Sequence, residues 1–212
     1  MKFFHEHPNH PHLDKRFYNP QFDYKMHNKK ILRGLLVVLS RLCQTNDVRC
    51  TIMHGSLIGY YFGKQMLPWD DDIDVIIVED DLHKFLKIRH NSKFHILEIN
   101  PNSINRSPHD RQNVIDARFI CKKTGIFIDI TFLTYNRIRK GLMNCKSPHY
   151  YVVCDILPLE KVEFEGCDVY VPNNIKTVLT SEYGRKVLIP RFKEWRFNGD
   201  KGWNKICLYS RK

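Results

Sequence analysis

Four aspartates lie within five residues in the stretch LPWDDDIDVII, which occupies residues 67–77. Asp72 and Asp74 are two residues apart at the start of an apolar run, so in a strand their side chains project to the same side. By the same alternation Asp71 points away and is dispensable, while Asp70 lies in the approach loop. Like charges this close repel each other, and Mg²⁺ or Mn²⁺ would relieve the repulsion. The spacing predicts a metal site for phosphoryl or nucleotidyl transfer.

A further carboxylate, Asp129, interrupts the apolar run IFIDITF. An ionised carboxylate inside a sheet is costly unless it is paired or bound to a metal. If its strand lies beside the strand that begins at Asp74, the carboxylates converge and Asp129 joins Asp72 and Asp74 as a catalytic group. The alternative is a structural ion pair with Arg118.

The tripeptide HGS lies between an expected strand and a short helix. A turn of this kind presents backbone N–H groups and a hydroxyl, so Gly55 and Ser56 are candidates for binding phosphate; the alternative is an ordinary turn and helix cap. His54 is a candidate general base, although a histidine at the end of a strand commonly has no catalytic role.

Several other side chains are candidates for substrate contact. Arg118 and the loop residues Arg106 and Arg111 could pair with phosphates of a donor, or, for the two in the loop, simply be solvated. Trp69 and Tyr183 could stack on a base, with packing as the alternative.

Around these residues the sequence predicts an ordered series of helices and strands. Apolar spacing predicts an amphipathic helix at 27–45, and β-branched runs bounded by turn residues predict strands and a hairpin. The expected strands are 48–53, 73–79, 94–99 and the hairpin 114–133, with short strand pieces in 150–172; the expected further helices are 80–88 and 173–184. The order predicts an α/β (α+β) fold, a mixed sheet with helices mainly on one face.

We expect three segments: an irregular N-terminal arm at 1–26, a folded domain at 27–190 and a C-terminal tail at 191–212. With 212 residues, 42% hydrophobic and 27% charged, the chain can bury a core. Seven cysteines without a CxxC pair argue against a disulfide framework or a standard zinc site. No apolar stretch is long enough to span a membrane, so the chain as given is expected to be soluble.

Taken together, MHGSLIGYYFGKQMLPWDDDIDVII and GIFIDITFL resemble the LicD family of phosphotransferases, which includes bacterial phosphocholine transferases, the fukutin group and fungal proteins of mannosyl phosphorylation. The resemblance extends over about residues 27–190, including DILPLEKVEFEG, VYVPNN and SEYG. HPHLDKRFY near the N-terminus is similar to the fungal branch.

The resemblance implies a nucleotidyltransferase-type fold that transfers a phosphorylated group from a CDP- or GDP-linked donor to a glycan or glycoprotein hydroxyl. It assigns metal ligation to Asp72 and Asp74, with Asp70 as an additional ligand and Asp129 as the third carboxylate, and phosphate contact to Gly55 and Ser56. Fungal and animal members work mostly in the secretory pathway, such as the Golgi, behind a membrane anchor.

Two other functions remain open at this point. One is a non-catalytic accessory protein of a glycan phosphotransferase. The other is an RNA-directed nucleotidyltransferase, which the net charge of +11 permits but for which no RNA-recognition motif is present, so no nucleic-acid partner is expected.

Overall fold

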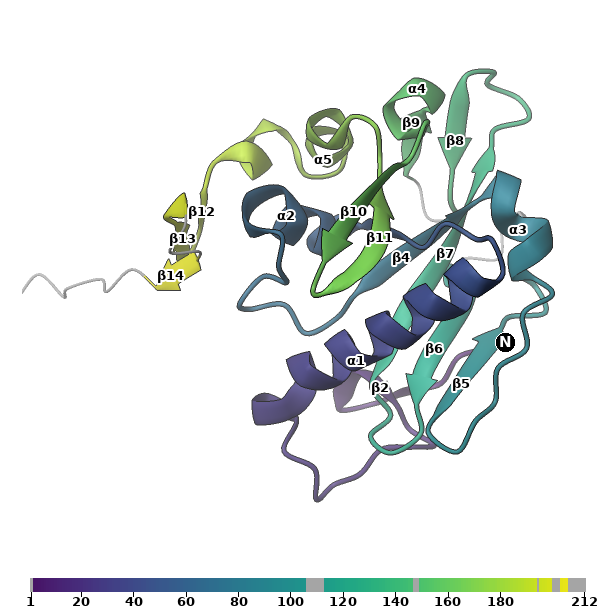
Figure 1. Ribbon diagram of the computed structural model, residues 1–212, viewed down its shortest axis with the longest axis vertical. Coiled ribbons are helices and arrows are strands. Elements are labelled where there is room, and N and C mark those ends of the chain that lie inside the picture. The colour runs from purple at the N-terminus through teal and green to yellow at the C-terminus, as the bar shows by residue number, and fades with distance from the viewer. Residues whose placement is uncertain (1, 106–112, 147–148, 194, 200–202, 206–212) are drawn as a thin grey trace, which may run out of the picture.

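The computed structural model describes residues 2–105, 113–146, 149–193, 195–199 and 203–205 (Figure 1). The helices are α1 (Tyr24–Thr45), α2 (His54–Gly63), α3 (Glu79–Phe85), α4 (Val153–Ile156), α5 (Ile175–Tyr183) and the 3₁₀-helix η1 (Arg185–Leu188). The strands up to the predicted hairpin are β1 (Glu6–His7), β2 (His10–Asp14), β3 (Thr51–Met53), β4 (Asp74–Val78), β5 (His95–Ile99), β6 (Ala117–Cys121) and β7 (Phe127–Tyr135). The later strands are β8 (Leu142–Asn144), β9 (Tyr150–Val152), β10 (Glu160–Phe164), β11 (Cys167–Val171), β12 (Arg191–Phe192), β13 (Trp195–Phe197) and β14 (Trp203–Lys205).

The main sheet is mixed, with the strand order β10-β11-β3-β4-β7-β6-β5. Strand β4 pairs parallel with β7 and antiparallel with β3, and β6 and β7 form the predicted antiparallel hairpin. The expected α/β (α+β) class with a mixed sheet is confirmed. Strand β4 is central and almost wholly buried, as its β-branched sequence DVIIV predicts.

Helix α1 lies across the face of the sheet that is nearer the viewer in Figure 1 and contacts β6, β7 and β11. Its buried side chains follow the predicted helical spacing and are Leu32, Leu35, Leu36, Leu39, Ser40 and Cys43. The helix begins three residues earlier than expected because the carboxylate of Asp23 accepts a hydrogen bond from the N–H of Met26 at 3.0 Å. No helix in the described part of the chain combines the length and apolar character needed to cross a bilayer.

The N-terminal arm is more regular than expected, because β1 and β2 pair as a short antiparallel hairpin. The arm is joined to the domain where Leu13 bridges Ile126 and where the Asp14 N–H donates to the Gly125 carbonyl at 2.8 Å. These tertiary contacts impose strand geometry on HPHLD, a sequence without the apolar alternation of a strand.

The C-terminal segment also contains more structure than a tail. Strands β12, β13 and β14 form a separate three-stranded sheet. The Phe192 ring stacks on that of Trp69, with ring centroids 4.8 Å apart. This contact joins the segment after residue 190 to the loop that carries the aspartates.

Candidate metal and phosphate site

Asp74 and Asp129 are neighbours in the sheet. They are direct partners in the parallel pairing of β4 with β7. On the outer sides of this pair, Met53 of β3 lies opposite Asp74 and Arg118 of β6 lies opposite Asp129. The predicted convergence of these two carboxylates therefore follows from strand register alone.

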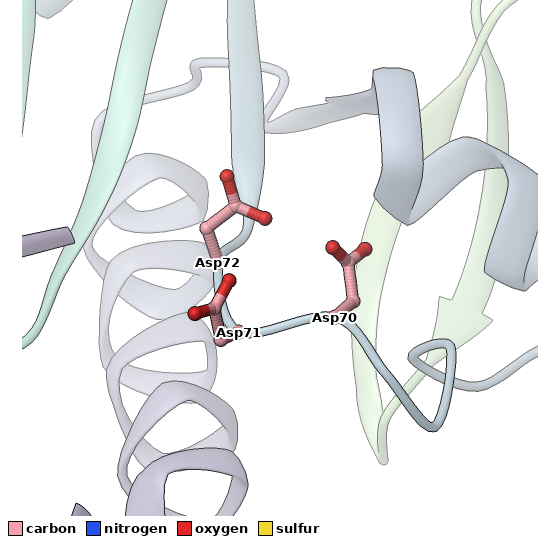
Figure 2. Close-up of side chains that lie close together, drawn as sticks. All are labelled: Asp70, Asp71 and Asp72. Carbon is pink, nitrogen blue, oxygen red and sulfur yellow. The ribbon is translucent and has the colours of Figure 1, made fainter. Parts of the chain in front are cut away.

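The loop before β4 brings three more carboxylates together. Oxygen atoms of Asp70, Asp71 and Asp72 lie within 4.8 Å of one another. Figure 2 shows their carboxylates on the same side of the loop. Asp71 does not point away as strand alternation predicted, because residues 70–73 precede the first residue of β4 and have no strand geometry.

Burial and mutual repulsion raise the pKa values of these acids. Burial raises the pKa of Asp70 to about 8, with Asp72 as the main repelling charge. Burial also raises the pKa of Asp74 to about 7; Asp72 and Asp129 add to the rise and His54 opposes it. Asp72 therefore links the loop carboxylates electrostatically to the strand pair. A bound cation would stabilise the ionised forms of all of them.

Arg118 makes the ion pair that the sequence offered as the structural alternative to a catalytic role for Asp129. Its Nε donates to Asp129 Oδ1 at 2.6 Å and its Nη2 donates to Glu6 Oε1 at 2.6 Å. The side chain is 1% exposed and its guanidinium lies 3.8 Å from the centroid of the Phe127 ring. Burial raises the pKa of Asp129 and Arg118 opposes that rise. Arg118 is thus a partner of Asp129, and only its buried Nη1 lacks a hydrogen bond among the described residues.

The first turn of α2 lies against the loop carboxylates. A Cβ on Gly55 would lie 2.6 Å from Asp70 Oδ2, so only glycine leaves room for the carboxylate at this distance. The Ser56 hydroxyl is buried and has no hydrogen-bond partner in the described part of the structure. An unpaired buried hydroxyl is costly, and a ligand oxygen would satisfy it. Both residues therefore remain candidates for phosphate contact.

His54 is held by a buried carboxylate that the sequence did not reveal. Its Nδ1 lies 3.0 Å from Glu182 Oε2, and the Tyr151 hydroxyl donates to Glu182 Oε1 at 2.6 Å. Burial lowers the pKa of His54, but the hydrogen bond to Glu182 and the negative charges of Glu182, Asp74 and Asp72 together outweigh it, and the net shift is upward. His54 also has a left-handed backbone, with φ 53°, which is uncommon for a non-glycine residue.

His12 in the N-terminal arm is a second residue that the sequence analysis missed. Its Nδ1 lies 3.5 Å from Asp72 Oδ2, and its Nε2 lies 4.0 Å from Asp71 Oδ1. The similarity of HPHLDKRFY to the fungal branch was the one signal in the sequence that could have drawn attention to it.

Of the remaining candidates for substrate contact, the structure describes Trp69 and Tyr183. Trp69 packs on Phe192, as its alternative interpretation held, whereas the side chain of Tyr183 is 49% exposed. Arg106 and Arg111 lie outside the described residues.

The mixed sheet, with acidic residues on two adjacent strands and in the loop before one of them, matches the class of nucleotidyltransferase-type domains. A family model described as "LicD/FKTN/FKRP, nucleotidyltransferase domain" matches residues 47–174. This is more than half of the chain, and the chain belongs to the LicD family.

Three relatives match this chain, and in each case the match covers less than two thirds of the relative's own length. Mannosyltransferase regulator 4 of Saccharomyces cerevisiae is 28% identical over 141 residues, 58% of this chain and 11% of the relative. Mannosyltransferase regulator 14 of the same yeast is 28% identical over 138 residues, 58% of this chain and 14% of the relative. Uncharacterized protein RP689 of Rickettsia prowazekii is 26% identical over 168 residues, 76% of this chain and 57% of the relative.

Proposed function

We propose that this domain transfers a phosphorylated group from a CDP- or GDP-linked donor to a hydroxyl of a glycan or glycoprotein, as in mannosyl phosphorylation. The observation that carries the proposal is the cluster of Asp70, Asp71 and Asp72 beside the first turn of α2, in the loop that leads directly to the strand pair Asp74 and Asp129. Membership of the LicD family and the names of the yeast relatives support a role in glycan modification.

The donor set fits a divalent metal. It consists of carboxylate oxygens, which Mg²⁺ and Mn²⁺ prefer, and the loop oxygens are close enough to share one ion. Asp72 and Asp74 would hold the metal with Asp70, and Asp71 is near enough to contribute. When bound, the metal would neutralise charge on the donor diphosphate and on the nucleoside monophosphate that leaves.

The chain's own residues then position the reactants. The Ser56 hydroxyl and the backbone of Gly55 contact a donor phosphate at the start of α2. Asp129, fixed by Arg118, orients the acceptor hydroxyl. Asp129 is already hydrogen-bonded to Arg118, whereas Glu182 orients the imidazole of His54, which favours His54 as the group that removes the hydroxyl proton.

The direct test is release of nucleoside monophosphate from a panel of CDP- and GDP-linked donors with Mn²⁺. Asp72→Asn and Asp74→Asn should each lower release at least ~10²-fold while thermal unfolding stays cooperative. Asp47→Asn is the matched control, because the Asp47 side chain is 91% exposed and pairs with Lys84 away from the site. Unchanged rates in the two site variants would refute the assignment.

A second candidate function follows from the names of the yeast relatives, both of which are regulators. In this alternative the domain assists a separate glycan phosphotransferase and does not turn over a donor. Thermal stabilisation by a CDP- or GDP-linked donor with Mn²⁺ distinguishes the two, because a ligand that binds only the folded state raises its melting temperature. A scaffold without a donor site should show no shift.

A further inference from the structure

A pocket of about 480 Å³ lies next to the carboxylate loop. It lies between α2, the loop before β4 and the segment from α5 to β12, which are neighbours in Figure 1. Gly55 and Asp70 are among the residues that line the pocket. A ligand in this pocket would therefore reach the proposed metal site directly.

Aromatic side chains form much of the pocket wall. Trp69 and Phe192 are stacked at an interplanar angle of 10°, and Tyr183 also lines the pocket. Tyr183 is 49% exposed and Phe192 is 44% exposed, which is high for such large apolar rings. Exposed aromatic faces inside a pocket are suited to stacking on a planar base.

The same pocket is lined by three positively charged side chains. Lys186, Arg191 and Lys193 line it, and in the described part of the chain none of their side chains is paired with a carboxylate. Lysines elsewhere do have such partners, as Lys146 has with Asp116 and Lys161 with Asp168. Positive side chains and aromatic rings in one pocket, which Asp70 also lines, complement an anionic ligand that carries a planar group.

We infer that this pocket binds the nucleoside diphosphate part of the donor, with the base against Tyr183 and the diphosphate between Lys186, Arg191 and the metal carboxylates. The inference rests on the proposed function and specifies where its donor lies. It also gives the C-terminal segment a role in binding, since Arg191 and Phe192 belong to β12.

Titration calorimetry with CDP, GDP and inorganic pyrophosphate in the presence of Mn²⁺ tests the inference. Tyr183→Ala should weaken CDP and GDP binding about ten-fold and leave pyrophosphate, which lacks a base, unchanged. Lys186→Ala/Arg191→Ala should weaken all three ligands about ten-fold and reduce the salt dependence of binding.

Two controls match these variants in chemistry. Tyr150→Ala removes a tyrosine that is 51% exposed on β9, and Lys87→Ala/Lys93→Ala removes two exposed positive charges from the segment between α3 and β5. Neither should change the affinity for any of the three ligands. Retained melting temperatures will show that every variant is folded.

The outcomes separate this inference from the function on which it rests. If nucleotides bind and the pocket variants bind them as tightly as wild type does, the pocket assignment is wrong and the proposed function stands. If an uncharged mannose oligosaccharide binds instead and Tyr183→Ala abolishes that binding, the pocket holds the acceptor and the inference is overturned. If wild type binds no nucleotide with Mn²⁺, the proposed function fails and this inference fails with it.

Discussion

Replacing Gly55 by alanine tests the geometry of the carboxylate site with one methyl group. The added Cβ would lie 2.6 Å from Asp70 Oδ2. To reach ordinary van der Waals contact at about 3.4 Å, the oxygen must retreat by roughly 0.8 Å. The substitution therefore displaces one expected metal ligand without removing its charge.

The expected effects on folding and on metal binding differ in size. Alanine is favoured over glycine in a helix by about 0.5–1 kcal/mol, and an off-rotamer shift of Asp70 costs about 0.5–1.5 kcal/mol. The free energy of unfolding should therefore change by less than about 1 kcal/mol. A metal shell with bonds of about 2.0–2.1 Å cannot absorb a displacement of roughly 0.8 Å. We expect Mn²⁺ affinity to fall about ten-fold and donor turnover by up to ~10²-fold.

Mn²⁺ titration calorimetry and thermal unfolding of the same preparations measure both quantities. Gly34→Ala is the control, because Gly34 lies inside α1 and its added Cβ would meet no atom within 4 Å. That variant should be slightly more stable than wild type and bind Mn²⁺ normally. Wild-type Mn²⁺ affinity in Gly55→Ala would show that Asp70 is not a ligand.

Three further perturbations follow from the buried charges. Arg118→Met leaves the Asp129 carboxylate buried without its partner, so the free energy of unfolding measured by denaturant titration should fall by about 3–5 kcal/mol. A loss below ~1 kcal/mol would contradict the structural role of this ion pair. Burial raises the pKa of Asp74 to about 7 from 3.8, so ionisation of Asp74 in the metal-free protein opposes folding. The free energy of unfolding should therefore fall as the pH rises through this range, and Asp74→Asn should remove that part of the pH dependence. Melting temperatures of wild type and Asp74→Asn that change in parallel with pH would refute this. Glu182→Gln removes the carboxylate that raises the pKa of His54, so that pKa should fall in an NMR titration, and an unchanged value would show that Glu182 does not control it.

Much of the fold could be predicted because its core elements are encoded locally. The buried side of α1 follows from 3.6-residue spacing, and the central strands follow from β-branched apolar runs. Asp129 was identifiable because an acid inside such a run requires a partner. Its convergence with Asp74 depends on β4 and β7 being neighbours and on the register that pairs the two residues.

The rest of the site depends on contacts between distant segments. Glu182 reaches His54 across 128 positions of sequence, and no local pattern indicates that pairing. His12 reaches the aspartates because the arm is joined to the domain at Leu13 and Ile126. The orientation of Asp71 was predicted incorrectly because alternation applies within a strand and not in the loop before it.

The most direct experiment measures Mn²⁺-dependent release of nucleoside monophosphate from CDP- and GDP-linked donors by wild type, Asp72→Asn, Asp74→Asn and the surface control Asp47→Asn. We expect release by wild type and the control, and at least ~10²-fold slower release by the two site variants, with cooperative unfolding preserved. Equal release by all four proteins, or release that persists without a divalent metal, would show that these carboxylates do not hold a catalytic metal.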